Sequence, residues 1–388
     1  MLWRKLFSFA IAGFLLVILP VSCFSPATKT PEIPIGLIVP LTGEVSELAG
    51  GDSVRGAELA VKEINDTGGL KVGDRQQKVK LLIEDDRDLP DVAIAAARKL
   101  IYHDEVVALV GLPLSRIAIP VAKIAEESRI PTISSWSSNP ETTAGKKYVF
   151  RVVYTDDFAG KAIARLARNE LNFRTAAVLY DIASEYNRGL AEFFQQEFEK
   201  VGGKVVAFES FTTNETDFTA QLNRIRNSQA EVLFLPNYPT EISRQIEQIQ
   251  KLDLKIELLG CDTWSSLPIS DRLHLEGAFF TDLWSPELED SKTQQFIQDY
   301  RLAYGEIPPT VAALTYDAMG LLFQAIASQG KIDPESIRQG LANTQRYHGV
   351  SGKLFYPDNG DPQRSILMMQ FKEGQATVYK IIEPDSIP

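Results

Sequence analysis

The chain has 388 residues, of which 44% are hydrophobic and 23% charged, and its formal net charge is −11. An acidic chain without a basic cluster argues against nucleic acid and against an anionic membrane surface as partners. Its length is sufficient for two hydrophobic cores.

The N-terminus has the composition of an export signal. Arg4 and Lys5 precede an apolar run at 6–19, which is shorter than the roughly 20 residues of a transmembrane helix, and Cys23 follows. This Cys resembles that of a bacterial lipobox, where it becomes the lipidated first residue, although Pro20 stands where a Leu is expected. We expect lipidation of Cys23; ordinary signal cleavage nearby is the alternative.

Cysteine content excludes a disulfide framework, because Cys261 is the one cysteine besides Cys23. We expect Cys261 to be a buried thiol.

The predicted elements begin with a short apolar strand at 35–40. A helix follows over 54–64, with Asp52 or Ser53 as its expected N-cap and Gly68 with Gly69 as its stop. The next elements are a strand at 79–83, a helix at 92–101, a strand at 106–111, a helix at 115–128 and a strand at 130–133.

A second alternating set begins after Tyr154. It comprises helices at 158–171, 187–201, 218–227 and 242–252, and strands at 176–181, 204–208, 232–236 and 256–259. Repeated strand–helix units build parallel sheets covered by helices. So many strands in one sheet are improbable, so the pattern predicts an α/β protein with two doubly wound lobes.

The C-terminal third departs from this alternation. It predicts helices at 293–304, 311–328 and 336–342, then strands at 352–356, 366–371 and 376–382. We expect the chain to return to the first lobe and to end in the second, which suits a hinge crossed several times. The expected divisions are a signal peptide at 1–22, a linker at 23–34, lobe I at 35–153 and about 283–350, and lobe II at 154–282 and about 351–388.

Signals of catalysis are missing from the sequence. His103, His274 and His348 are far apart and none has metal-ligand spacing. Nucleophile-elbow, zinc-protease, phosphate-loop and dinucleotide-binding motifs are missing. The acidic run at 84–88 lacks the glycine and the final Glu of a calcium loop. We expect no enzyme activity, no metal and no cofactor.

Polar residues follow several strands of both lobes. Ligands of doubly wound sheets bind beyond the carboxyl ends of the strands, where helix N-termini favour anions. Ser115 opens a helix there, either as an N-cap or as a hydroxyl for a carboxylate. The loop at 134–140 is rich in hydroxyls and contains Trp136, Ser137 and Ser138, although turn formation alone could explain that composition.

In the other lobe an acid and two aromatic residues hold comparable positions. Asp262 follows the strand at 256–259, where it could meet an ammonium group or serve as a helix cap. Tyr186 and Tyr238 also follow strands, and each could equally be a core or surface residue. Hydroxyls opposite a carboxylate would satisfy both charges of a zwitterion.

Motifs over about 330 residues resemble the branched-chain amino-acid (leucine/isoleucine/valine) type of periplasmic binding protein. They are IGLIVPLTG at 35–43, RGAELAVKEIN at 55–65, Gly68-Gly69, Val110-Gly111 before Ser115, PTIS at 131–134, Phe150-Arg151 before Asp156 and Gly160, and GVSG at 349–352 before NGD at 359–361. The resemblance implies a type I periplasmic binding fold serving an ABC importer.

The family's ligand contacts match positions of this chain. The resemblance implies that Ser115 and Ser138 bind the ligand carboxylate. It implies that the Trp136 carbonyl and Asp262 take the ammonium group. Tyr186 would close the site, with Tyr238 as another contact.

Two departures leave the specificity open. Trp136 stands where relatives often have a small residue and should crowd the pocket. The first loop has Glu47, Leu48 and Ala49 where some relatives present an aromatic side chain. The aromatic residues, with Trp264 nearby, favour an apolar or aromatic ligand side chain.

The leading hypothesis is an exported, lipid-anchored receptor that binds an amino acid and docks on a membrane permease. A urea-like amide or an aromatic acid is the alternative ligand, although it would leave Asp262 without an ammonium partner. A sensor domain would need an output module or a membrane segment after residue 22. Mechanistically we expect an open free state and a closed liganded state.

Overall fold

The computed structural model describes residues 32–384. The predicted signal peptide, Cys23 and most of the predicted linker lie outside these residues.

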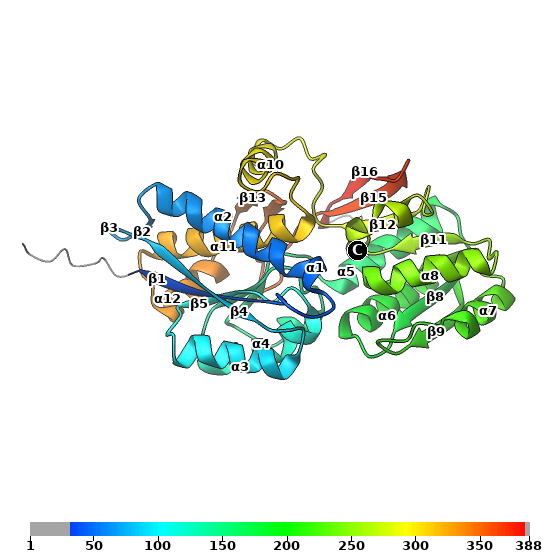
Figure 1. Ribbon diagram of the computed structural model, residues 1–388, viewed down its shortest axis with the longest axis horizontal. Helices are drawn as coiled ribbons and strands as arrows, with labels where there is room; N and C mark the ends of the chain where they lie inside the picture. Colours follow the sequence, from blue (N-terminus) through cyan, green and yellow to red (C-terminus); the bar gives the residue numbers. More distant parts are fainter. Residues whose placement is uncertain (1–31, 385–388) are drawn as a thin grey trace, which may run out of the picture. The chain divides into compact units, whose positions relative to one another are not determined.

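The first lobe is built on a five-stranded parallel sheet with the order β4-β1-β5-β6-β7. Its strands are β1 (Ile33–Val39), β4 (Val79–Asp85), β5 (Ala108–Gly111), β6 (Thr132–Ser134) and β7 (Val149–Arg151). Its helices are α1 (Ser46–Ala49), α2 (Gly51–Asp66), α3 (Pro90–Tyr102), α4 (Ser115–Ser128), α10 (Ser291–Tyr304), α11 (Thr310–Gln329) and α12 (Pro334–Ala342). Helices α2 and α11 pack together on one face of the sheet, and α3 and α4 pack together on the other (Figure 1).

The second lobe contains a seven-stranded sheet with the order β16-β15-β12-β11-β10-β8-β9. Its strands are β8 (Thr175–Asp181), β9 (Lys204–Phe211), β10 (Val232–Phe234), β11 (Glu257–Gly260), β12 (Phe279–Asp282), β15 (Ile366–Lys372) and β16 (Gln375–Ile382). Its helices are α5 (Asp156–Arg165), α6 (Glu185–Lys200), α7 (Thr219–Ser228), α8 (Pro239–Lys251) and α9 (Ile269–Arg272). Strands β15 and β16 are antiparallel, whereas the other strands run parallel.

The predicted fold class of two doubly wound lobes is confirmed. The predicted helix at 115–128 matches α4 residue for residue. Strands β7 and β12 were not predicted from the sequence. Neither was the hairpin of β2 (Leu70–Val72) with β3 (Arg75–Gln77). A further hairpin pairs β13 (Tyr347–Gly349) with β14 (Gly352–Leu354). Of these two strands, β14 falls within the predicted strand at 352–356. The strands that were not predicted have three or four residues each.

Most predicted helix ends lie within three residues of the observed ones, and two helices differ in a way that the structure explains. Neither Asp52 nor Ser53 caps α2, because the helix already begins at Gly51 and the Ser53 hydroxyl donates to the Ala49 carbonyl at 2.6 Å. The predicted helix at 158–171 ends as α5 at Arg165 and continues as a π-helical turn, Leu166–Glu170.

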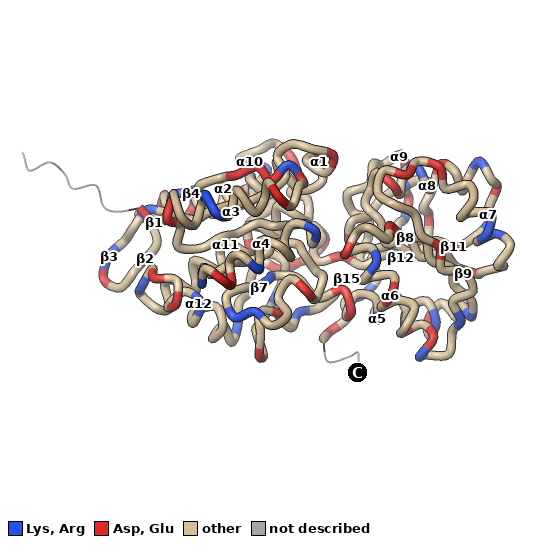
Figure 2. The backbone as a smooth tube through the Cα atoms, turned by 90° about the horizontal axis from the view of Figure 1, so that it is seen from below, with Lys and Arg blue, Asp and Glu red and all other residues tan. Residues whose placement is uncertain are grey.

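The long apolar helix α11 is a core element. The helix has 20 residues, and the mean hydropathy of its most apolar 18-residue window is 1.3, which would suit a membrane span, but 78% of this window is buried inside the protein. Lys and Arg are interspersed with Asp and Glu over both lobes (Figure 2).

Three connections join the two sheets, and one buried side chain links them. They run from β7 to α5, from β12 to α10, and from β14 to β15. The Arg364 guanidinium, which is 5% exposed, donates to the carbonyls of Val152 at 2.5 Å, Leu283 at 2.9 Å and Ser351 at 2.8 Å. Arg364, which itself lies in the third connection, therefore binds the backbone of the other two connections and of the turn between β13 and β14.

Candidate ligand-binding cleft

A small cavity lies at the carboxyl ends of strands from both sheets. Its lining residues are Leu48, Pro113, Leu114, Ser115, Trp136, Tyr186, Tyr238, Asp262 and Thr263. Five of the predicted site residues are therefore brought together from both lobes. The cavity volume is about 10 Å³, which is the space that one water molecule needs.

Ser115 is placed at the cavity by a tight turn after β5. Gly111 has a φ of 103°, and a Cβ atom there would lie 2.5 Å from the Ile38 carbonyl oxygen. Glycine is required by both the dihedral and the space. Ser115 is the first residue of α4 and not its N-cap, which is Leu114; its hydroxyl lies 2.9 Å from that of Ser137. Because α4 begins at Ser115, the N–H groups of its first turn have no carbonyl partner within the helix and can receive an anion.

Asp262 is placed by the end of β11. A Cβ atom on Gly260 would clash with the ring of Trp264, so glycine lets the chain turn over this ring. Asp262 then begins a 3-10 helix, Asp262–Ser266. Its carboxylate accepts from the Trp136 indole Nε1–H at 2.7 Å and from the Tyr186 hydroxyl. The first of these contacts joins the two lobes.

The Asp262 carboxylate is 3% exposed. Burial raises its pKa, and the hydrogen bonds from Tyr186 and Trp136 oppose that shift without cancelling it. A cation beside Asp262 would favour the ionised form. The electrostatics of the site therefore suit a positively charged ligand group.

Tyr186 and Tyr238 form an aromatic wall on the second lobe. Their rings stack with centroids 5.6 Å apart. The Arg116 guanidinium of α4 lies 5.4 Å from the Tyr238 ring centroid, which is a cation–π distance. Arg116 also donates to Asp88 at 2.6 Å. Another hydrogen bond between the lobes runs from the Asn139 side-chain amide to the Glu185 carbonyl, at 2.9 Å.

Ser137 and Ser138 do not line the cavity. The Ser137 hydroxyl lies 2.7 Å from that of Thr142, besides its contact with Ser115. The Ser138 carbonyl accepts from the Asp156 N–H at 2.9 Å. Both serines are buried, so they support the loop that carries Trp136.

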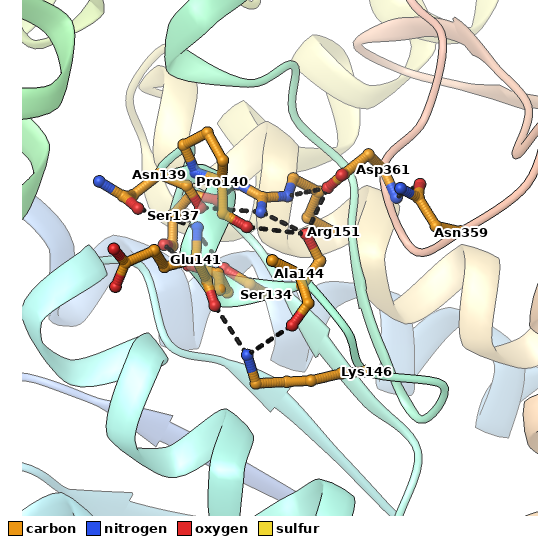
Figure 3. Close-up of polar contacts among 12 residues, drawn as sticks. Ser134, Ser137, Asn139, Pro140, Glu141, Ala144, Lys146, Arg151, Asn359 and Asp361 are labelled. Carbon is orange, nitrogen blue, oxygen red and sulfur yellow. Dashed lines mark hydrogen bonds and ion pairs between the residues drawn. The ribbon is translucent and has the colours of Figure 1, made fainter. Parts of the chain in front are cut away.

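Arg151 holds this loop from behind (Figure 3). Its fully buried guanidinium donates to the carbonyls of Ser137 and Asn139, each at 2.8 Å, and to the Thr143 hydroxyl at 2.6 Å. Its Nε forms an ion pair with Asp361 at 2.7 Å, and Asp361 also accepts from Thr143 at 2.6 Å. The loop at 134–140 is therefore connected, through Arg151 and Asp361, to the segment between β14 and β15.

We expect Asp361→Asn to lower the free energy of unfolding by about 1.5–3 kcal/mol, the value of a hydrogen bond to a charged group. The substitution leaves the buried Arg151 charge without its anion. Urea denaturation of this variant should be compared with that of Asp358→Asn, an exposed position nearby that should stay within about 0.5 kcal/mol of wild type. Equal stability of the two variants would contradict the importance of the ion pair.

Asp156 is a second buried acid, at the first turn of α5. Burial raises its pKa to about 8, against which the Ser138 hydroxyl acts weakly. The folded protein thus binds this proton more tightly than the unfolded chain does. The associated stabilisation is complete below the ordinary Asp pKa and is lost as the pH rises through about 8.

Asp156→Asn should therefore flatten the pH dependence of stability. From pH 5 to pH 8.5 the wild type should lose at least about 1.4 kcal/mol more than the variant, the equivalent of one pKa unit. Denaturant titrations across this range measure the difference. Parallel curves would show that Asp156 is ionised in the folded protein throughout.

Several cavity residues were not anticipated. Pro113, Leu114 and Thr263 line it, and each lies within two positions of a predicted site residue. Trp264, expected near the ligand, is instead fully buried in the core, where its indole donates to the Leu235 carbonyl at 3.2 Å. Its place after Asp262 puts it on the inner side of the turn.

Other sequence predictions concern cysteine and metals. Cys261 is buried and free, as predicted, and burial raises its pKa to about 12. Across residues 32–384 the structure contains no group of three or more His, Cys, Asp or Glu residues that could hold a metal ion.

The model of the periplasmic binding protein family matches residues 32–376. The chain belongs to this family. This periplasmic binding protein is 28% identical over 364 residues to the leucine-, isoleucine-, valine-, threonine- and alanine-binding protein of Pseudomonas aeruginosa, with 92% of each chain covered.

Solved structures agree with this assignment. The leucine-binding protein LivK of Thermotoga maritima superposes with a TM-score of 0.83 at 29% identity, covering 91% of this chain and 99% of that one. LivJ of Streptococcus pneumoniae, solved with isoleucine, has a TM-score of 0.83 at 25% identity, with 91% and 100% covered. The resemblance to the branched-chain amino-acid type is confirmed.

Proposed function

We propose that this periplasmic binding protein is the extracytoplasmic receptor of an ABC importer, binding an α-amino acid between its lobes and delivering it to a membrane permease. One observation carries the proposal. The cavity places the N-terminus of α4 with Ser115 on one lobe and the Asp262 carboxylate on the other. These groups complement the two charges of an amino acid.

In the proposed complex the ligand carboxylate lies at Ser115 and the N-terminus of α4, and the ammonium group at Asp262. The Trp136 carbonyl would also face the ammonium group, as in the family. Ser137 and Ser138 affect ligand binding indirectly, because they support the loop that carries Trp136. Direct contact by their side chains stays a prediction, because their hydroxyls lie outside the cavity lining.

The rest of the lining favours an apolar ligand side chain. Leu48, Leu114, Tyr186 and Tyr238 are apolar or aromatic, and the named substrates of the relatives include leucine and isoleucine. The aromatic wall gives such a side chain a buried contact surface.

Binding requires the lobes to open, because a cavity of about 10 Å³ cannot admit an amino acid. We propose a hinge at the three connections, with lobe I at 35–153 and about 283–350 and lobe II at 154–282 and about 351–388. Contacts from both lobes then make ligand binding favour the closed state.

Export and anchoring complete the proposal. We place the protein on the outer side of a cytoplasmic membrane, in the periplasm or cell envelope, with the predicted signal peptide removed and Cys23 lipidated. Mass spectrometry of the mature N-terminus should show a diacylglyceryl Cys23; a free Ser, Val or other residue near the cut would contradict anchoring.

A thermal-shift screen of the protein from residue 24 onward tests the function. Amino acids, the same acids without the amine, urea, simple amides and aromatic acids should be compared. A ligand that binds the folded state raises the melting temperature, so a rise confined to amino acids is the expected result. No rise with any amino acid would contradict the proposal.

A carboxylic acid without an amine is the second candidate ligand. Burial raises the pKa of Asp262, and a protonated Asp262 would carry no charge and would need no ammonium partner. The same screen decides, because aromatic or branched acids alone would then raise the melting temperature.

A further inference from the structure

Trp136 and Asp262 meet directly across the cleft. The indole Nε1–H of Trp136 lies 2.7 Å from one carboxylate oxygen of Asp262, and the Tyr186 hydroxyl donates to the other. The side chains of Trp136 and Asp262 are 5% and 3% exposed. Each oxygen of the carboxylate thus has a protein donor in a buried site.

The same indole closes the space that a ligand would need. It is part of the lining that reduces the cavity to about 10 Å³. An amino acid cannot enter the closed cleft while Trp136 keeps this position. The indole must therefore move away from Asp262 before the lobes can close on a ligand.

We propose that the Trp136 indole N–H is an internal competitor of the ligand, because it occupies the position at Asp262 that the ligand ammonium group must take. This inference rests on the proposed function. Binding exchanges a neutral hydrogen-bond donor for a charged one at the same carboxylate. The net gain in binding free energy is the difference between the ammonium–carboxylate hydrogen bond that forms and the indole–carboxylate hydrogen bond that breaks.

The exchange selects for an amine. A ligand that displaces Trp136 without supplying an ammonium group leaves a buried carboxylate oxygen without a donor, which is unfavourable. Such a ligand is rejected even where its carboxylate and side chain fit. The indole also limits affinity for amino acids, because its own hydrogen bond must first be broken.

Trp136→Phe tests the inference, because it keeps an aromatic ring and removes the N–H. L-leucine and its amine-free analogue 4-methylpentanoate are the probes, measured by titration calorimetry. We expect the variant to bind L-leucine about tenfold more tightly than wild type, since the competing hydrogen bond is gone. A similar gain should appear for 4-methylpentanoate, which must also displace the indole in the wild type, while L-leucine stays the tighter ligand of both proteins because Asp262 favours the ammonium group.

Tyr300→Phe is the matched control, because it also keeps an aromatic ring and removes a donor to a carboxylate. Tyr300 is fully buried in α10, its hydroxyl donates to Asp52 at 3.0 Å, and it does not line the cavity. Its substitution should leave both affinities unchanged. A Trp136→Phe variant that binds L-leucine more weakly, or no differently, would overturn the inference.

A measurement without ligand separates this inference from the proposed function. If the Trp136–Asp262 hydrogen bond holds the lobes together, Trp136→Phe should show a larger radius of gyration by small-angle X-ray scattering than wild type or Tyr300→Phe. Equal radii, in a wild type that binds L-leucine, would overturn the inference alone. A larger radius in a protein that binds no amino acid would overturn the proposed function and still show that the indole closes the cleft.

Discussion

Asp262→Asn should weaken the binding of L-leucine, or of whichever α-amino acid binds best, by about 2–5 kcal/mol, roughly 30- to 5,000-fold. The substitution removes the buried negative charge that we assign to the ligand ammonium group. An amide oxygen can still accept from Trp136 or Tyr186, so the contacts that close the cleft are retained in part. Titration calorimetry measures the loss.

Two controls make the Asp262 result specific. Glu257→Gln removes one negative charge from the exposed, opposite end of the same strand β11 and should leave affinity unchanged. The Asp262→Asn variant should also melt at or above the wild-type temperature, because a buried charge has been removed. Wild-type affinity in Asp262→Asn would refute the assignment of the ammonium group.

Arg364→Met should lower the free energy of unfolding by about 3–5 kcal/mol, as expected when one member of a buried charged network is removed. The guanidinium supplies donors to the Val152, Leu283 and Ser351 carbonyls, and Met can supply none. The charge is also close to the buried carboxylates Asp317 and Asp282. Urea denaturation followed by circular dichroism gives the difference.

Arg346→Met is the control for Arg364, because Arg346 is exposed and its substitution should change stability by no more than about 0.5 kcal/mol. If Arg364→Met loses less than about 1 kcal/mol of stability, water replaces the guanidinium as the donor to the Val152, Leu283 and Ser351 carbonyls.

The alternation of strands and helices was predictable because it depends on local patterns. Helix α4 shows apolar residues at helical spacing and begins directly after the turn at Gly111, so its bounds were found. Strands β7 and β12 were missed because Arg151 in β7, and Thr281 with Asp282 in β12, interrupt runs that are already short. Their presence is decided by pairing with β6 and β11.

The candidate site was predictable to the extent that position along a strand determines it. Ser115, Trp136, Tyr186, Tyr238 and Asp262 all follow parallel strands, and carboxyl ends of such strands gather at one edge of a sheet. Side-chain direction was not predictable in the same way. Ser137 faces Ser115 and Thr142, and Trp264 faces the core, because the turn geometry of each loop decides which residues reach the cavity.

By itself the sequence determined the fold class, the two sets of strand–helix units and the residues at the strand ends. The reason is that periodicity, turn residues and burial pattern act over a few neighbouring positions. Only the tertiary structure decided that Trp136 donates to Asp262, 126 residues away, and that Arg364 donates to the carbonyls of Val152, Leu283 and Ser351. Those contacts depend on how the two lobes meet, which no local pattern encodes.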